Sequence, residues 1–216
     1  VIPYLDDLTE SARLIGAVNT VLHQDGLLIG HNTDGIGFFK SLETLRAFHV
    51  RNKRLTILGG GGASTAIIAQ AAIDGAKEIT IFCRPKSVER TVVTVQTIAQ
   101  STGVSLQVLP NNDSQLLAEH INNSDLLING TSVGMDGTSL PLPATIRFPE
   151  ELLVADVIYQ PFETPLLKMA NSQGNPTING LGMLLFQAAE AFELWTGKEM
   201  PTDLIWQLLV QKYDIK

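Results

Sequence analysis

The 216-residue sequence is poor in cysteine, and Cys83 is the only one it contains. A single cysteine excludes an internal disulfide, so covalent cross-links cannot hold the parts of the fold together. Proteins of this kind are typical of reducing compartments. We therefore expect a cytoplasmic location.

Positive charge and long apolar runs are also scarce. Acidic residues outnumber basic ones by 22 to 15, which gives a formal net charge of -7. Negative charge argues against nucleic acid or anionic lipid as the main partner, although local basic groups can still bind an anionic small molecule. No apolar run approaches the roughly 20 residues that cross a bilayer. Hydrophobic residues at 44% are typical of a compact soluble protein with its own core.

The N-terminal stretch predicts a helix followed by a hairpin. The chain begins with Val1 rather than Met, which we expect of a fragment, a processed product or a trimmed chain. Apolar residues at helical spacing predict a helix over Val1–Leu14. Two apolar runs, 20–23 and 27–30, flank a turn that contains Asp25-Gly26, which predicts a β-hairpin.

From residue 54 onward, strand and helix patterns alternate. A buried-type strand over 55–58 leads through Gly59-Gly60-Gly61-Gly62 into a helix over 63–74, and further strands and helices follow. Such alternation implies an α/β fold with a doubly wound parallel sheet, Rossmann-like, with helices on both faces. Two consecutive helices, 180–195 and 202–212, end the chain, and we expect them to pack against the N-terminal segment.

The four-glycine turn is the first candidate site. A turn from a buried strand into a helix presents unpaired backbone N–H groups, which bind a pyrophosphate together with the helix dipole. Gly59 would permit the tight turn, Gly61 would let the phosphate approach, and Ala63 or Ser64 would be the third small residue. A plain strand–helix turn without a ligand is the alternative.

The end of the second strand of this series bears on the cofactor. Its sequence, Phe82-Cys83-Arg84-Pro85-Lys86, has no carboxylate to bind the ribose 2′-hydroxyl of NAD. Arg84 and Lys86 can instead hold a 2′-phosphate, which favours NADP and leaves NAD as the alternative. Both residues can also be ordinary solvated loop charges.

Six motifs, taken together and in this order, resemble those of shikimate dehydrogenase and its quinate/shikimate relatives. They are Gly16-Ala17-Val18-Asn19-Thr20, Asn32-Thr33-Asp34-Gly35, Gly59-Gly60-Gly61-Gly62-Ala63-Ser64, Asn129-Gly130-Thr131-Ser132-Val133-Gly134-Met135, Asp156-Val157-Ile158-Tyr159 and Gly180-Leu181-Gly182-Met183-Leu184-Leu185-Phe186-Gln187. The resemblance implies an oxidoreductase of aromatic amino-acid biosynthesis, on the shikimate pathway to chorismate. Its reaction would be the reversible reduction of 3-dehydroshikimate to shikimate by a nicotinamide cofactor.

The resemblance also implies roles for single residues. Asp34 would be the catalytic aspartate, sharing proton transfer with a lysine. The substrate-binding residues would be Asn19, Asp34, Tyr159 and Gln187. The cofactor-binding residues would be Gly59, Gly61, Gly62 and Ala63 at the pyrophosphate, Arg84 at the adenosine ribose, Thr131 and Val157 in the cleft, and Gly180 and Met183 at the nicotinamide. No metal site is predicted.

Each of these side chains also has a plain structural reading. Asp34 can be a helix N-cap, and Asn19 can be a turn residue. Tyr159 can close a strand and pack its ring, and Gln187 can face solvent on its helix. Met183 is typical of core packing.

The chain departs from the family at its beginning. The family carries a Ser-x-Ser element and a catalytic lysine, in a Pro-x-Lys motif, just upstream of the position of Val1. Neither occurs in these 216 residues, and lysines such as Lys40 and Lys53 fall elsewhere. We therefore predict that the chain alone binds cofactor but is a very poor dehydrogenase.

The cofactor motif departs as well. The family's NADP-type motif reads Asn-Arg-Thr followed by another basic residue, and here Cys83, Pro85 and Val88 replace three of those four. The acid that the NAD-using branch carries near Lys86 is also absent.

We predict three parts and a small-molecule partner. Residues 1–33 would be the remnant of a substrate-binding lobe, 34–178 the NAD(P)-binding Rossmann domain, and 179–216 C-terminal helices that return to the substrate lobe. The partner would be shikimate or 3-dehydroshikimate, with no nucleic acid, no membrane and a homodimer as a candidate assembly. The alternatives are a quinate/shikimate dehydrogenase that uses NAD and a non-catalytic dinucleotide-binding module, although a pure binding module has no need of four polar groups aimed at one cleft.

Overall fold

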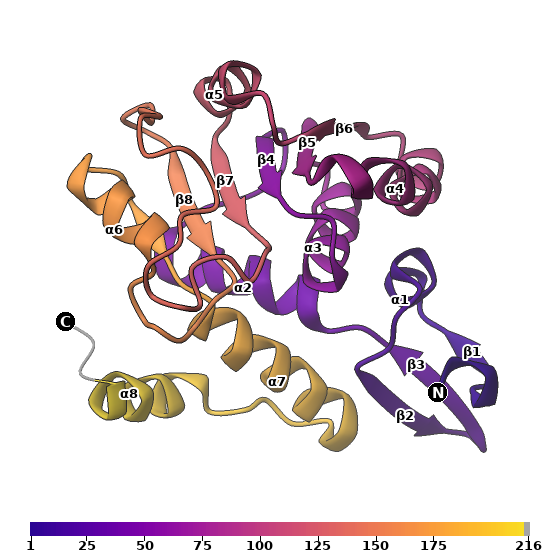
Figure 1. The fold of residues 1–216 in the computed structure, drawn as a ribbon. Helices are drawn as coiled ribbons and strands as arrows, with labels where there is room; N and C mark the ends of the chain where they lie inside the picture. The colour runs from indigo at the N-terminus through magenta and orange to yellow at the C-terminus, as the bar shows by residue number, and fades with distance from the viewer. Residues whose placement is uncertain (214–216) are drawn as a thin grey trace.

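The larger part of the molecule is built on a six-stranded parallel sheet. The computed structural model describes residues 1–213. The strand order is β6-β5-β4-β7-β8-β9 (Figure 1). The strands are β4 (Arg54–Leu58), β5 (Glu78–Cys83), β6 (Ser105–Pro110), β7 (Leu126–Asn129), β8 (Leu153–Asp156) and β9 (Thr177–Ile178). This order reverses between β4 and β7, where doubly wound folds bind their ligands. The predicted Rossmann-like α/β class is confirmed.

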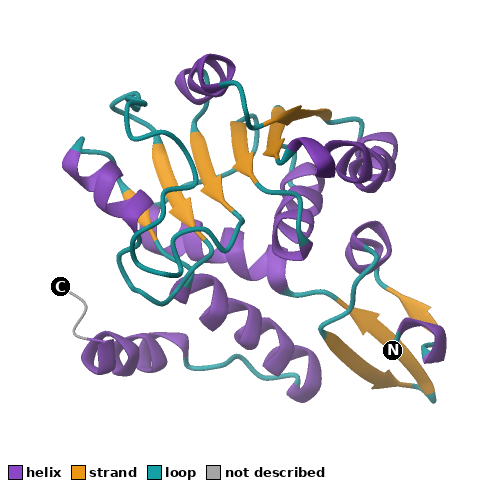
Figure 2. Cartoon of the chain, viewed as in Figure 1, coloured by secondary structure: helices purple, strands orange, loops and turns teal. Residues whose placement is uncertain are grey.

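Helices cover both faces of this sheet (Figure 2). One face packs on α2 (Asp34–Arg46), α3 (Gly62–Ile73) and α4 (Val88–Thr102), and the other on α5 (Ser114–Asn122) and α6 (Pro165–Ser172). Neighbouring strand residues alternate between the two cores, as Ile57 and Leu58 do. Burial on both faces explains why the strands are nearly continuous apolar runs.

A small second sheet, order β1-β3-β2, lies at the N-terminal end. Its strands are β1 (Asp7–Leu8), β2 (Thr20–Gln24) and β3 (Leu27–His31). The predicted hairpin is confirmed, because β2 and β3 are antiparallel and Asp25 and Gly26 have φ of 52° and 85°. Positive φ at both central residues is what a two-residue hairpin turn requires.

The predicted helix over Val1–Leu14 is wrong in its first half. A 3-10 turn, η1 (Ile2–Tyr4), precedes β1, and only α1 (Glu10–Ile15) is α-helical. Asp7 and Leu8 pair with β3 in parallel, so sheet pairing overrides the helical spacing of the apolar residues.

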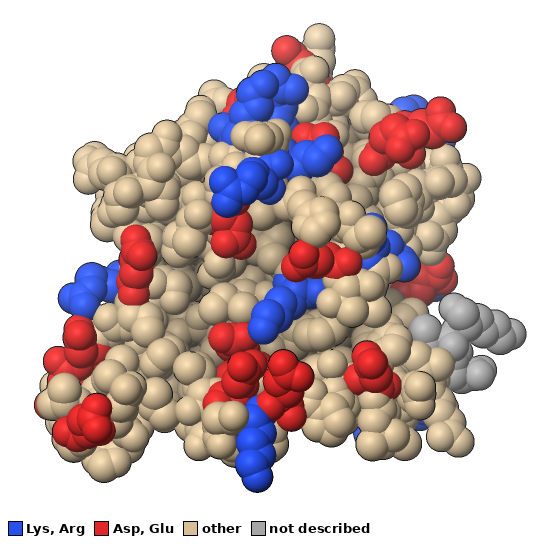
Figure 3. Space-filling view, turned by 180° about the vertical axis from the view of Figure 1, so that it is seen from behind, with Lys and Arg blue, Asp and Glu red and all other residues tan. Residues whose placement is uncertain are grey.

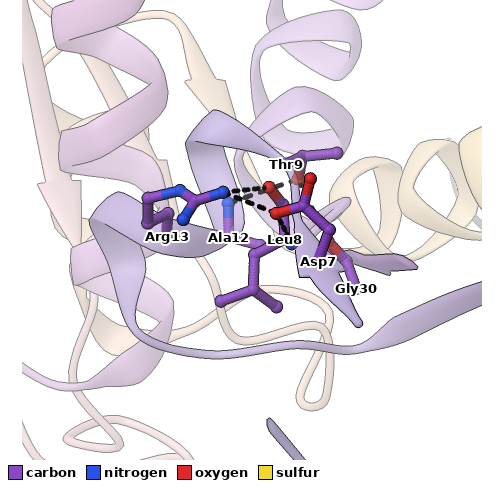
Figure 4. A network of polar contacts seen from close by, with 6 residues as sticks. All are labelled: Asp7, Leu8, Thr9, Ala12, Arg13 and Gly30. Atoms are coloured by element: carbon purple, nitrogen blue, oxygen red, sulfur yellow. Dashed lines mark hydrogen bonds and ion pairs between the residues drawn. The ribbon is translucent and has the colours of Figure 1, made fainter. Parts of the chain in front are cut away.

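Polar contacts then join α1 to β1 (Figure 4). Arg13 donates to Oδ1 of Asp7 over 2.7 Å and to the Leu8 carbonyl over 3.0 Å. The pKa of Asp7 is lowered, first by the hydrogen bond from the Leu8 amide and then by that from Arg13. A Cβ at Gly30 would lie within 2.7 Å of the side chains of Leu5, Leu8 and Val18, so a larger residue there would displace these side chains.

The first of the two C-terminal helices connects the two parts. Helix α7 (Leu181–Thr196) runs beside α2, and α8 (Thr202–Tyr213) follows it (Figure 1). Nε1 of Trp195 donates to the Val21 carbonyl of β2 over 3.0 Å. The division at residues 33 and 178 stays a prediction, and residues 214–216 of the predicted last part lie outside the described residues.

Charges of both signs are spread over the surface. On the face turned away from the viewer in Figure 1, basic and acidic side chains lie close to one another without one continuous basic field (Figure 3). Within residues 1–213, no helix combines the length and the apolar character that a membrane span requires.

Candidate active site

A cavity of about 340 Å³ lies at the carboxyl ends of the central strands. Four predicted cofactor-binding residues line it: Gly59, Gly61, Arg84 and Thr131. A larger cavity of about 620 Å³ lies between α2, α6 and α8 and contains none of the predicted site residues. The smaller cavity is the better candidate site, because it lies at the reversal of strand order.

The glycines of the turn serve different purposes. Gly59 has φ of +100°, and a Cβ there would lie 2.7 Å from Cγ2 of Thr131. A Cβ at Gly60 would lie 2.4 Å from Oγ1 of Thr91. By contrast, a Cβ at Gly61 would meet no atom within 4 Å. The fold itself therefore requires small residues at the first two positions, whereas Gly61 leaves room on the cavity side.

Helix α3 begins at this turn with free backbone donors. Its N-cap, Gly61, has no side chain to cap the helix. The first-turn amides, including those of Gly62 and Ala63, have no intrahelical acceptor. Together with the helix dipole they form an anion-binding site next to the cavity.

Of the two cations that follow β5, the structure brings only one to the cavity. Arg84 and Lys86 are both exposed, but only Arg84 is among the residues that line the cavity. Ser87, Arg90 and Asn111 line it as well. The sequence reasoning missed these three residues, since nothing local distinguishes them from solvated helix and loop positions.

A second hollow of about 460 Å³ adjoins the first and shares Thr131 with it. Val157 and Tyr159 line this hollow. The start of α7 lies against the same segment: a Cβ at Gly180 would lie 2.0 Å from the Val157 carbonyl oxygen. Met183 is 9% exposed and belongs to the core between α2, α7 and the sheet.

Four polar side chains from three parts of the chain form one connected group, which we call the polar cluster: Asn19, Thr33, Asp34 and Gln187. Nδ2 of Asn19 lies 3.0 Å from Oδ1 of Asp34 and 3.1 Å from Oγ1 of Thr33. Oγ1 of Thr33 lies 3.5 Å from Oε1 of Gln187. Because α2 and α7 cross closely here, a Cβ at Gly37 would lie 2.4 Å from the Gln187 amide nitrogen.

Asp34 does not cap its own helix. The Asp34 amide donates to Oδ1 of Asn32 over 3.1 Å. The side chain of Asn32, rather than that of Asp34, therefore accepts from this first backbone N–H of α2. Within residues 1–213, Asn19 is the only hydrogen-bond donor to the Asp34 carboxylate, and Oδ2 has no partner. Burial raises the pKa of Asp34, and the hydrogen bond from Asn19 opposes the shift. A carboxyl group of this kind can exchange a proton with a bound hydroxyl.

The other predicted substrate residues are placed unequally. Gln187 is half-buried and joins the polar cluster through Thr33. Tyr159 is 44% exposed and makes no hydrogen bond with any residue in the range 1–213. Thr33 was missed as a site residue, although it lies inside the Asn32-Thr33-Asp34 motif and is 1% exposed.

A buried network at the ends of β7 and β8 holds the walls of both hollows. Asp156 is 1% exposed and accepts hydrogen bonds from Asn129, the Ile158 amide and Thr164 over 3.1, 3.0 and 2.7 Å. Oδ1 of Asn129 in turn accepts from the amide and hydroxyl of Thr131. Burial raises the pKa of Asp156 to about 6 against these hydrogen bonds.

Comparison with known proteins gives one consistent result. Residues 180–210 match the family described as the Shikimate 5'-dehydrogenase C-terminal domain. The chain is 82% identical to a protein named Shikimate dehydrogenase (NADP(+)) from Streptococcus suis, over all 216 residues and 75% of that relative.

Solved structures agree with this. A shikimate 5-dehydrogenase from Listeria monocytogenes, in complex with shikimate and NAD, has a TM-score of 0.91 and 44% identity over 96% of this chain and 73% of its own. A Thermus thermophilus shikimate 5-dehydrogenase, in complex with NADP(H) and shikimate, has a TM-score of 0.77 and 33% identity over 94% of this chain and 70% of its own.

Proposed function

The chain belongs to the shikimate dehydrogenase family, and on this premise we propose that it acts in the reversible, NADP-dependent reduction of 3-dehydroshikimate to shikimate. It provides the cofactor cleft and part of the substrate site. The polar cluster is the observation that carries this proposal, because it connects the half-buried Asp34 carboxylate, through Asn19, to Thr33 and Gln187.

The residues at the cleft fit a phosphorylated dinucleotide. Gly61 leaves open space on the cavity side, and the first-turn amides of α3 offer donors for the pyrophosphate. Arg84 stands at the end of β5, where the adenosine ribose is held in folds of this order. Thr131 and Val157 line the adjoining hollow, and Gly180 packs on the Val157 carbonyl. Gly180 and Met183 would lie on the nicotinamide side.

A bound nicotinamide would accept the hydride in alcohol oxidation and donate it in ketone reduction, and the chain's own residues handle the proton. In alcohol oxidation, the free Oδ2 of Asp34 accepts the proton of a ring hydroxyl, and in ketone reduction it returns that proton. Asn19 holds the other carboxylate oxygen and orients the group. Thr33 and Gln187 extend the polar surface, and Tyr159 lies on the wall of the hollow beside it.

The test compares two forms of the protein. One is the 216-residue chain, and the other is this chain extended by the segment by which the Streptococcus suis relative exceeds it. We expect both to bind NADP. NADPH formation from shikimate should be on the order of 100-fold or more slower in the short form, since a partner in proton transfer contributes that much. Equal turnover of the two forms would contradict the proposal that the added segment supplies part of the active site. Failure of both forms to bind NADP would contradict the proposed cofactor cleft.

Asp34→Asn in the extended form tests the role of the carboxylate. We expect kcat to fall by about 10²-fold or more with unchanged NADP affinity. Full activity of this variant would remove the carboxylate from the mechanism. Quinate and NAD serve as competing substrate and cofactor in the same assay, and a preference for both would favour the quinate/shikimate branch instead.

A homodimer and a cytoplasmic location complete the proposal. The support for the location is chemical, since the one cysteine, Cys83, is buried and unpaired. Sedimentation of the extended form tests the dimer, and fractionation of the cells that produce it tests the location.

A further inference from the structure

The cofactor cavity carries a local positive charge, opposite in sign to the net charge of the chain. Two of its lining residues, Arg84 and Arg90, are cations, and within residues 1–213 none of the lining residues is acidic. The whole chain has a formal net charge of -7. An anionic group on the ligand is therefore favoured at this part of the cleft.

Neither of these guanidinium groups is engaged by the protein. Within the described residues, no carboxylate lies within 4 Å of Arg84 or Arg90, and neither side chain donates a hydrogen bond. Arg13 and Arg54, by contrast, are engaged by carboxylates: Arg13 pairs with Asp7, and Arg54 lies 3.6 Å from Glu78. Arg84 and Arg90 thus keep their donors for a ligand.

The close approach of α4 to the glycine turn explains why Arg90 reaches the cavity. Thr91 is 2% exposed and packs so tightly on Gly60 that a Cβ there would clash with it. Its hydroxyl also donates to the Ser87 carbonyl over 2.8 Å. The first turn of α4 is therefore held against the turn between β4 and α3, which brings its neighbours Ser87 and Arg90 to the cavity wall.

We propose that Arg90 is a specificity-determining residue of this cleft and, together with Arg84, selects a cofactor that carries a ribose 2′-phosphate. The inference rests on the proposed NADP-dependent function and adds to it a residue from α4. A guanidinium group forms strong, charge-assisted and often bidentate hydrogen bonds with phosphate, which a ribose hydroxyl cannot match. The half-buried Ser87 and the Asn111 side chain stand beside the two cations as further polar partners.

Lys86 provides the matched control. It is an exposed cation on the short segment between β5 and α4, as Arg84 is, but it does not line the cavity. Arg90→Gln and Lys86→Gln each remove one positive charge, six and two residues after Arg84. Long-range electrostatics would affect both variants alike, whereas direct contact affects only the first.

The experiment is calorimetric titration of the 216-residue chain and its variants with NADP, NAD and adenosine 2′,5′-bisphosphate. For Arg90→Gln we expect NADP and the bisphosphate to bind about 10- to 100-fold more weakly, as the loss of hydrogen bonds to a charged group implies. NAD affinity should change by less than about 3-fold, and Arg90→Lys should recover part of the loss. Lys86→Gln should leave all three affinities within about 2-fold.

The possible results test the role of Arg90 separately from the proposed NADP-dependent function. Equal weakening of NADP and NAD by Arg90→Gln, equal effects of the two glutamine variants, or unchanged NADP binding would each overturn the role of Arg90. A wild-type chain that binds neither NADP nor the bisphosphate would overturn the proposed function, and the inference with it. Circular dichroism of each variant confirms that the fold is retained, which we expect because both side chains are exposed.

Discussion

Asn19 holds Asp34 through a hydrogen bond of 3.0 Å between Nδ2 and Oδ1. The two residues lie 15 positions apart, one before β2 and the other at the start of α2. The contact connects the small sheet to the helix that packs on the large one. It also leaves one carboxylate oxygen free, because Asn32 rather than Asp34 accepts from the helix amide.

Asn19→Ala should therefore change both substrate binding and pH dependence. The hydrogen bond from Asn19 lowers the pKa of Asp34 against the effect of burial, so its loss raises that pKa further. In shikimate oxidation Asp34 must be ionised, and the acidic limb of kcat/KM should move to higher pH. The KM for shikimate should rise by about 10-fold in the extended form.

Asn123→Ala is the control for this variant. Asn123 lies at the end of α5, and its side chain donates to the Glu119 carbonyl, away from the polar cluster. We expect it to leave both the pH profile and the KM unchanged. An Asn19→Ala profile that coincides with that of the wild type would contradict the coupling of the two residues.

Thr33 should matter through its hydroxyl rather than its shape. Thr33→Val keeps the β-branched form but removes the group that joins Asn19 to Gln187. Thr33 is 1% exposed, so the loss of its hydroxyl leaves polar groups of Asn19 and Gln187 without this hydrogen-bond partner. We expect the free energy of unfolding to fall by about 1–3 kcal/mol and the KM for shikimate to rise. Thr33→Ser keeps the hydroxyl and should retain the wild-type KM. If both variants raise the KM equally, the hydroxyl is not what positions the cluster.

Gly61→Ala should separate cofactor binding from stability. A Cβ at Gly61 meets nothing within 4 Å, and its φ of -88° suits alanine. We expect the free energy of unfolding to fall by less than about 1 kcal/mol, because alanine is only a poorer N-cap. NADP affinity should fall by about 10-fold or more, since the methyl group occupies the space through which the pyrophosphate approaches.

Gly60→Ala should behave in the opposite way. Its Cβ would lie 2.4 Å from Oγ1 of Thr91, so the main effect should be destabilisation through the displaced start of α4. Urea unfolding and NADP titration of both variants provide the comparison. An unchanged NADP affinity for Gly61→Ala would exclude close approach of a phosphate at this residue.

Local sequence signals predicted the parts of the fold that local chemistry determines. The Asp25-Gly26 turn and the alternation of apolar strands with helices from residue 54 onward needed no knowledge of distant contacts. Strand β1 could not be predicted in this way, since Asp7 and Leu8 become a strand only by pairing with residues 29 and 30.

The residues of the candidate site also differ in whether a local motif could predict them. Gly61 and Asp34 stand in motifs that carry their chemistry in sequence. Arg90 reaches the cleft only because Thr91 packs on Gly60, and Thr33 joins Gln187 only because α2 and α7 cross at Gly37. Such contacts depend on tertiary packing, so periodicity and spacing do not show them.

Asp156 should make the fold less stable as pH rises, whereas an aspartate with a lowered pKa makes a fold more stable. Its pKa is raised from 3.8 to about 6 in the fold, first by burial. The folded state therefore binds the proton more tightly than the unfolded state does. The stabilisation this gives is fully present below about pH 4 and is lost as pH rises through about 6. The change amounts to at most about 3 kcal/mol.

Asp156→Asn should remove this dependence, because asparagine does not titrate. The difference in unfolding free energy between wild type and variant, measured in urea at several pH values, should shift by a few kcal/mol in favour of the variant between about pH 4 and about pH 7. Asp25→Asn is the control, since Asp25 is exposed and asparagine also tolerates its φ of 52°. For the control pair the difference should stay flat, and a flat difference for Asp156→Asn as well would contradict the burial argument.

Thr164→Val tests the pKa of Asp156 by removing one of its hydrogen-bond donors. The Thr164 hydroxyl donates to Oδ2 of Asp156 over 2.7 Å and lowers its pKa, so the valine variant should raise that pKa further. Thr164 also caps α6 through the Leu167 amide, which adds a loss of stability that does not change with pH. Stability of this variant should fall with rising pH over a range that extends above that of the wild type. A narrower range would mean that the hydroxyl does not stabilise the charged carboxylate.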